Sequence, residues 1–354
     1  MLARQAWRAV CFFVAGVVTF YPTAVPEFNS DCAPKSVRLV AELSLPPPTN
    51  AKTAFVDTLS FAPNSHKLYA GYTSENLIIA FDTLKNEIVA TISDLPNVRG
   101  IAFVPGLKIG FTCNRLHRSI GVVDLKTNAL IRIIEIEGEP EAILYDPKVK
   151  LIYVADSAGK AGLLIDPETQ KIVANIPLGG TPESVRVDPK SGLIYQILSD
   201  TEEAAVIDPI ARAVVKRFKT TGGERPAGLA LDSKNHRIFI ACENGILLIM
   251  NSDSGEIASS VPIGKGADTA DFDPKWKRVY TANGQSGTMS VLEESGKDYY
   301  SALEEVETRV GARALAVDLK SHRIYLSNGD KISVYEPIRV PRNAETGASP
   351  GTPF

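Results

Sequence analysis

A three-residue marker recurs about every 42 residues along most of this 354-residue chain. It ends in proline in five of its seven copies: Phe61-Ala62-Pro63, Phe103-Val104-Pro105, Tyr145-Asp146-Pro147, Val187-Asp188-Pro189, Leu231-Asp232-Ser233, Phe272-Asp273-Pro274 and Val317-Asp318-Leu319. The third residues of successive copies are 42, 42, 42, 44, 41 and 45 positions apart. Self-similarity at a fixed period of this length is typical of proteins built from repeated structural units.

Each repeat contains four short β-prone runs, here called strands a to d in chain order, separated by turns rich in Asp, Asn, Gly and Pro. Four strands per repeat predict an all-β protein, a seven-bladed β-propeller of four-stranded antiparallel blades. The seventh repeat stops after strand c, at Glu336-Pro337, so one strand is missing. The alternating segment from Ser36 to Leu43 has the pattern of a strand, and we expect it to join the last blade and close the ring.

The repeats resemble those of the YVTN-type β-propeller family, in which strand b often ends in a Tyr-Val-x-Asn segment. The nearest segments here are Tyr153-Val154-Ala155-Asp156 and Tyr280-Thr281-Ala282-Asn283, and the resemblance extends from Ser36 to Pro337. It implies a protein of the cell surface or periplasm, because members of this family are mostly binding or uncharacterised proteins of these locations. Related propellers host lactonases, lyases and quinone enzymes, so the resemblance selects no reaction.

The ends of the chain differ from the repeats. Arg4 and Arg8 precede an apolar run over residues 9–20, the order of a secretory signal, and the run is short for a bilayer span. We therefore predict a signal peptide or N-terminal anchor over residues 1–24, a linker over 25–35, the propeller over 36–337 and a disordered tail over 338–354. The expected location is periplasmic or secreted, with no membrane span unless the N-terminal segment stays uncleaved.

Net charge and the positions of cysteine and histidine limit the possible partners and sites. The net charge of −3 and the absence of a basic block exclude nucleic acid as an expected partner. Cys113 and Cys242 fall on strand b of different blades, where we expect buried thiols rather than a disulfide. His66, His236 and His322 share one position in the turn between strands a and b, which predicts a structural role at the rim. We expect a monomer.

One position in the repeat is occupied by a charged residue in most blades. Six residues before the end of each marker, where the chain enters strand a beside the axis, six of seven blades carry a charged residue. In chain order the seven residues are Asp57, Arg99, Glu141, Glu183, Ala227, Asp268 and Arg313. The next residue is small in every blade, as a crowded axis requires: Thr58, Gly100, Ala142, Ser184, Gly228, Thr269 and Ala314. We therefore predict a ligand-binding site formed by Asp57, Arg99, Glu141, Glu183, Asp268 and Arg313.

The chemistry of this ring has three interpretations at this stage. Arg313 and Arg99 flank Asp57 in ring order, and their unused donors would suit a carboxylate or phosphate ligand. The adjacent Glu141 and Glu183, with Asp268, would instead hold calcium or another divalent cation through oxygen atoms. In the third interpretation the charges pair with one another and only solvate the mouth of the channel.

The predicted function follows from these interpretations. We expect a binding or scaffold propeller that recognises a protein partner or a small ligand at the mouth of the central channel. The alternative is a metal-assisted lactonase or lyase that uses the carboxylates there. No residue is assigned a catalytic role and no cofactor is expected apart from that cation, because a poised base beside a nucleophile or activated water is not evident in the sequence.

Overall fold

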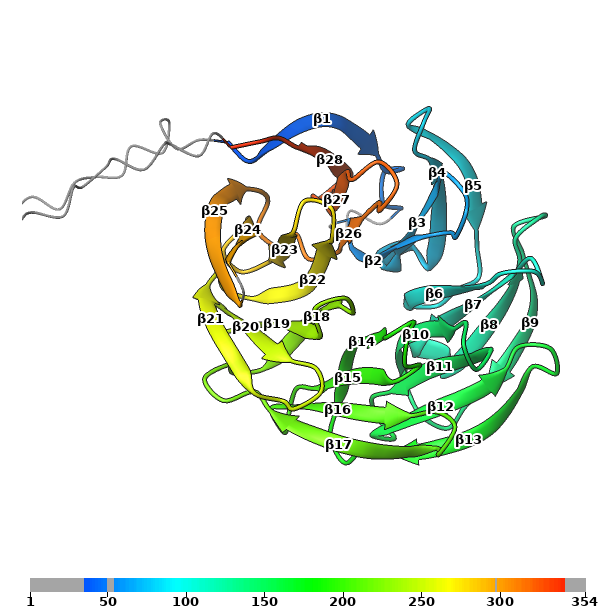
Figure 1. Ribbon diagram of the computed structural model, residues 1–354. Coiled ribbons are helices and arrows are strands. Elements are labelled where there is room, and N and C mark those ends of the chain that lie inside the picture. The colour runs from blue at the N-terminus through cyan, green and yellow to red at the C-terminus, as the bar shows by residue number, and fades with distance from the viewer. Residues whose placement is uncertain (1–34, 50–53, 297, 341–354) are drawn as a thin grey trace, which may run out of the picture. The chain divides into compact units, whose positions relative to one another are not determined.

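The computed structural model describes residues 35–49, 54–296 and 298–340. The predicted signal segment, almost all of the linker and residues 341–354 of the predicted tail lie outside these residues. The described residues form seven four-stranded antiparallel sheets arranged around a central axis (Figure 1). The prediction of a seven-bladed β-propeller is thereby confirmed. No helix in the described ranges has the length and apolar character needed to cross a membrane.

Each blade begins with its innermost strand. These inner strands are β2 (Val56–Phe61), β6 (Val98–Val104), β10 (Pro140–Asp146), β14 (Pro182–Val187), β18 (Pro226–Asp232), β22 (Ala267–Asp273) and β26 (Leu315–Val317). The second strands are β3 (Lys67–Tyr72), β7 (Ile109–Asn114), β11 (Leu151–Asp156), β15 (Ile194–Leu198), β19 (Arg237–Cys242), β23 (Arg278–Asn283) and β27 (Ile324–Ser327). The third strands are β4 (Leu77–Asp82), β8 (Ser119–Asp124), β12 (Ala161–Asp166), β16 (Glu203–Asp208), β20 (Ile246–Asn251), β24 (Thr288–Gly296) and β28 (Lys331–Pro337). The outer strands are β5 (Glu87–Ile92), β9 (Ala129–Glu135), β13 (Lys171–Pro177), β17 (Ala213–Lys219), β21 (Ile257–Pro262), β25 (Tyr299–Glu307) and, for the last blade, β1 (Val37–Ser44).

The N-terminal strand closes the ring, as the sequence predicted. β1 pairs antiparallel with β28, from Val37 opposite Pro337 to Ser44 opposite Lys331. The start of β1 is also tied to the neighbouring blade, because the Glu304 carboxylate on β25 accepts hydrogen bonds from the backbone N–H groups of Ser36 and Val37 and from the Ser36 hydroxyl. The fully buried Arg278 on β23 donates to the Ser36 carbonyl at 2.8 Å. Ile338 continues the edge by donating its N–H to that same carbonyl, so regular pairing extends one residue into the predicted tail.

The repeated acidic residue of the marker has a structural cause. Asp146 Oδ1 accepts the backbone N–H of Lys148 at 2.8 Å, and Asp273 Oδ1 accepts that of Lys275 at 2.9 Å. A side chain that caps its own turn in this way mimics a backbone turn, which explains why Asp and Asn recur at strand ends. All three histidines lie between the first and second strands of their blades; His236 and His322 adopt the left-handed backbone conformation, and the His66 carbonyl accepts the backbone N–H and hydroxyl of Thr83.

Packing between blades forms most of the core. Phe239 of β19 stacks against Phe272 of β22 with ring centroids 5.1 Å apart, and Tyr300 of β25 meets Phe239 edge-on at 5.2 Å. Cys113 and Cys242 are buried free thiols, as predicted. At the axis the inner strands approach so closely that a Cβ atom on Gly228 would lie 2.8 Å from the backbone nitrogen of Ala270. The small residues predicted beside the axis therefore allow the seven inner strands to converge.

Replacing Glu304 with alanine should lower the free energy of unfolding by about 1–3 kcal/mol, because the N–H groups of Ser36 and Val37 lose their acceptor at the closing strand. Urea denaturation followed by far-ultraviolet circular dichroism measures this change. The neighbouring Glu305 is exposed, so Glu305→Ala is the matched control and should change stability by less than about 0.5 kcal/mol. Equal unfolding midpoints for the two variants would refute the anchoring role of Glu304.

Candidate functional site at the axis of the ring

A register irregularity places the charged ring residues on the axis. In β2 the pairing with β3 shifts between Val56 and Thr58, so Asp57 is an extra residue in the ladder. The same shift occurs around Arg99, Glu141, Ala227 and Asp268, and over residues 182–185 in β14. A β-bulge bends its strand and re-aims the side chain of the extra residue. In the last blade β26 begins only at Leu315, and Arg313 lies just ahead of it.

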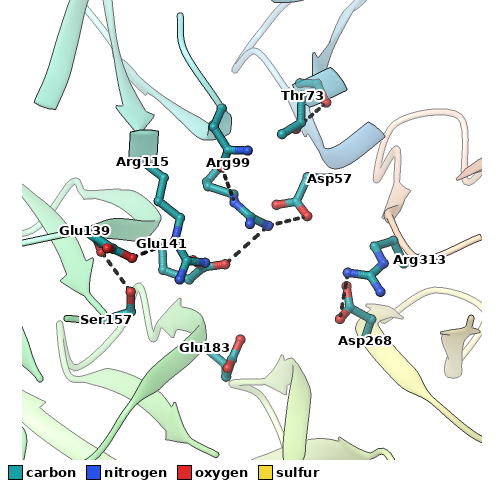
Figure 2. A network of polar contacts seen from close by, with 12 residues as sticks. Asp57, Thr73, Arg99, Arg115, Glu139, Glu141, Ser157, Glu183, Asp268 and Arg313 are labelled. Carbon is teal, nitrogen blue, oxygen red and sulfur yellow. Dashed lines mark hydrogen bonds and ion pairs between the residues drawn. The ribbon is translucent and has the colours of Figure 1, made fainter. Parts of the chain in front are cut away.

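These residues surround one cavity of about 430 Å³ that is lined by residues from all seven blades, and Figure 2 shows the six charged ring residues around it. All six charged residues that the sequence singled out line it, together with Ala227. Three further charged residues contribute: Arg115, in the short 3-10 helix Arg115–His117 after β7, Glu243, after β19, and Arg186 on β14. The cavity therefore lies where the inner strands begin, beside the connections between second and third strands.

Arg99 is the centre of a network of ion pairs in blades 1 to 3. Its Nη1 lies 2.8 Å from Asp57 Oδ1 and 3.7 Å from Glu141 Oε1, and its Nε donates to Asn97 Oδ1 at 3.1 Å (Figure 2). Burial opposes the positive charge, yet the attraction of Asp57 and Glu141 raises the pKa of Arg99 above its usual value. The guanidinium thus stays ionised, with two of its donors already in use.

Glu141 extends this network to a second arginine. Its Oε2 lies 2.6 Å from Arg115 Nη1, while Arg115 Nε lies 3.1 Å from Glu139 Oε2. Burial raises the pKa of Glu141 to about 7; Arg99 and Arg115 oppose the rise, and the negative charges of Asp57 and Glu183 add to it. Both carboxylate oxygens of Glu141 therefore face guanidinium groups, and the carboxyl titrates close to neutral pH.

The opposite side of the cavity is paired far less completely. The Glu183 carboxylate accepts a hydrogen bond from Ser199 Oγ at 3.0 Å, and within the described residues no Lys, Arg or His nitrogen lies within 4 Å of it. Asp268 has one ion pair, with Arg313 Nη1 at 3.9 Å. Burial raises the pKa of both carboxyls, to about 6 for Asp268. This side therefore carries negative charge that the protein itself compensates weakly.

Three residues after Glu183 and Asp268 along the inner strands, the charged side chains of Arg186 and Asp271 bind backbone groups. Arg186 uses its guanidinium on backbone oxygens, donating to the Val185 carbonyl at 3.0 Å and the Ala270 carbonyl at 3.2 Å. Asp271 accepts the backbone N–H groups of Val317 at 2.8 Å and Phe272 at 3.0 Å. Because these groups are satisfied by the backbone, the ring of residues above them supplies the side chains that remain available for a ligand.

The structure shows how these charges pair. Arg313 neighbours Asp57 in ring order, but its ion pair in the described residues is with Asp268. Glu141, one of the two glutamates considered for a divalent cation, pairs with Arg99 and Arg115. Within the described residues no group of three His, Cys, Asp or Glu side chains is placed to hold a metal ion.

Sequence reasoning missed Arg115, Glu139 and Glu243, which lie outside the inner strands. Arg115 and Glu243 share one repeat position, ten residues after the end of the marker and directly after the second strand, but only these two blades carry charge there. The run Asn114-Arg115-Leu116-His117-Arg118 was the available signal, because its charge follows directly on a buried strand.

Comparisons with known proteins agree with the architecture. The fold is similar to that of a chain of Kuenenia stuttgartiensis hydrazine synthase, with a TM-score of 0.72 and 17% sequence identity over 82% of this chain and 97% of that chain. At this identity the likeness shows the β-propeller fold alone. No family model matches the chain, and no curated protein matches its sequence. The YVTN-type resemblance therefore stays a prediction.

The raised pKa of Glu141 predicts how the free energy of unfolding depends on pH. The folded state holds this proton more tightly than an unfolded chain, whose carboxyl titrates near 4.5. The free energy of unfolding should therefore fall as pH rises from about 4.5 to about 7, and then level off. Asp268 and Glu183, whose pKa values are also raised, contribute in the same direction.

We expect Glu141→Gln to flatten this dependence, removing a fall of about 1–3 kcal/mol between pH 5 and pH 7. Urea denaturation at a series of pH values measures it, with the exposed Glu305→Gln as the control. Carboxyls with lowered pKa values, such as Asp200 at about 2, act below this window and do not obscure it. An unchanged slope in Glu141→Gln would show that Glu141 titrates normally.

Proposed function

We propose that this protein is a ligand-binding β-propeller that receives a small, polar, charged molecule in the cavity at its axis. The observation that carries the proposal is the cavity itself, which measures about 430 Å³ and is lined by both carboxylate and guanidinium groups. Small-molecule sites occupy about 300–1,000 Å³. A recess of this size favours a small ligand over a protein partner, which would engage the rim.

The pairing of the charges supports binding rather than metal-assisted catalysis. A calcium ion held by Glu141 would have to displace Arg99 and Arg115, which face its two carboxylate oxygens at 3.7 and 2.6 Å. Two guanidinium groups at this range disfavour a divalent cation by like-charge repulsion. The lactonase or lyase alternative, which depends on such a cation, receives no comparable support from the described residues.

Two features of the sequence support the biological setting. The YVTN-type repeats imply a surface or periplasmic binding protein, and the N-terminal order of Arg4, Arg8 and an apolar run is that of an export signal. We therefore propose that the protein works outside the cytoplasm. N-terminal sequencing of the protein recovered from its native compartment tests this assignment.

A thermal-shift screen with amino acids, amines, carboxylates, sugars, phosphates and calcium tests the binding proposal, because a ligand that binds only the folded state raises its stability. At least one organic compound should give a saturable rise, worth about 2.7 kcal/mol at one hundred times its dissociation constant. Calcium should give none.

The rise should disappear in Ala142→Phe, which fills the cavity from β10, and persist in Ala129→Phe, which places the same ring on the exposed face of β9. A stabilisation that survives Ala142→Phe would locate the ligand elsewhere. A calcium shift that is lost in Glu141→Gln/Glu183→Gln would overturn the proposal in favour of the metal-assisted alternative.

A further inference from the structure

The two halves of the cavity differ in how far their charges are satisfied. In blades 1 to 3 the ion pairs run without a break from Asp57 through Arg99, Glu141 and Arg115 to Glu139. In blades 4 to 7 the only ion pair between cavity-lining residues, among those described, is Asp268 with Arg313 at 3.9 Å. A ligand that brings its own charge therefore gains most in the second half.

The second half contains the one ring position without a charged side chain. Ala227 of blade 5 lies in ring order between Glu183 of blade 4 and Asp268 of blade 6. Blades 2 and 7 present arginine at the equivalent position, beside carboxylates of the adjoining blades. At this position blade 5 has the short side chain of Ala227 beside the carboxylates of Glu183 and Asp268, whereas blades 2 and 7 have an arginine.

Arg313 provides a complementary positive group on the same side. Among the described residues its buried Nε has no hydrogen-bond partner, and its guanidinium lies 5.3 Å from the centre of the Phe55 ring (Figure 2 shows its approach to Asp268). A guanidinium presents five N–H donors, and in the part of the chain that the structure describes the one ion pair of Arg313 is with Asp268. The open half therefore has an acceptor pole at Glu183 and Asp268 and a donor pole at Arg313.

We propose that the open half of the cavity binds a small zwitterion, with its ammonium group over Ala227 between Glu183 and Asp268 and its anionic group on Arg313. This inference rests on the proposed function and names its ligand class. Among the described residues Glu183 has no ion pair within 4 Å and Asp268 has one long pair with Arg313 at 3.9 Å, so an ammonium group would add a close positive charge beside both carboxylates. Two donors of Arg186 are held by carbonyl oxygens, and a simple anion on Arg313 would lie near the carboxylates of Asp268 and Glu183, which repel it.

The vacancy is tested by filling it with a tethered cation. Ala227→Lys places an ammonium group in the open half, and Ala227→Met adds similar length without charge. We expect Ala227→Lys to have the higher melting temperature of the two at pH 7.5, and that advantage to shrink when Glu183→Gln is added. A lysine variant no more stable than the methionine variant would overturn the cation subsite.

The ligand class is tested with β-alanine, ethylamine and propionate, which share a short carbon chain and differ in charge. Binding is followed by the carbon-13 methyl signal of Ala227. β-Alanine should give a saturable shift with at least tenfold higher affinity than ethylamine, and propionate should give none. Glu183→Gln should weaken β-alanine at least tenfold, and Arg313→Met should reduce its affinity to that of ethylamine.

These outcomes separate the inference from the proposed function. If propionate binds as well as β-alanine, or if neither amine shifts the Ala227 signal, the zwitterion subsite is wrong. The broader proposal still stands if another compound of the screen stabilises the protein and Ala142→Phe abolishes that effect. If no organic compound in the screen binds, both fail.

Discussion

The pairing of β1 with β28 is the interaction on which the site depends, because it joins the two ends of the repeat array into a ring. An open array of seven blades would expose a sheet edge and would not bring its first and last inner strands together. Asp57 comes from the first blade and Arg313 from the last, yet both line one cavity. Glu304 and Arg278 hold the start of the closing strand against the neighbouring blade and thereby support this juxtaposition.

Charge at the axis follows from a second constraint, the crowding of seven inner strands. The crowding is greatest at Gly228, where a Cβ atom would lie 2.8 Å from the backbone of the next blade. Six blades have a register shift just before or at the small residue; in five of them it turns a charged side chain toward the axis, and in blade 5 the residue is Ala227. The repeat thus presents one such position per blade, and the alanine of blade 5 at that position contributes to the asymmetry of the cavity.

Several features were predictable because they recur once per period. The seven blades, the closing strand, the buried Cys113 and Cys242 and the six charged ring residues all followed from aligning the repeats. The tyrosine pair of blade 6 illustrates the limit of this approach. Tyr299 is exposed, whereas Tyr300 packs on Phe239 of the preceding blade, and alternation along an outer strand does not reveal which face a neighbouring blade covers.

The sequence by itself determined the architecture and the set of charged residues at the axis, because periodicity in a repeat protein maps directly onto position in the ring. Only the tertiary structure decided which charges pair. Arg99 lies between Asp57 and Glu141, Arg115 joins from the connection after β7, and among the described residues Glu183 has no ion pair within 4 Å. These choices depend on side-chain reach and burial across blades that are distant along the chain, and those quantities exist only once the ring is closed.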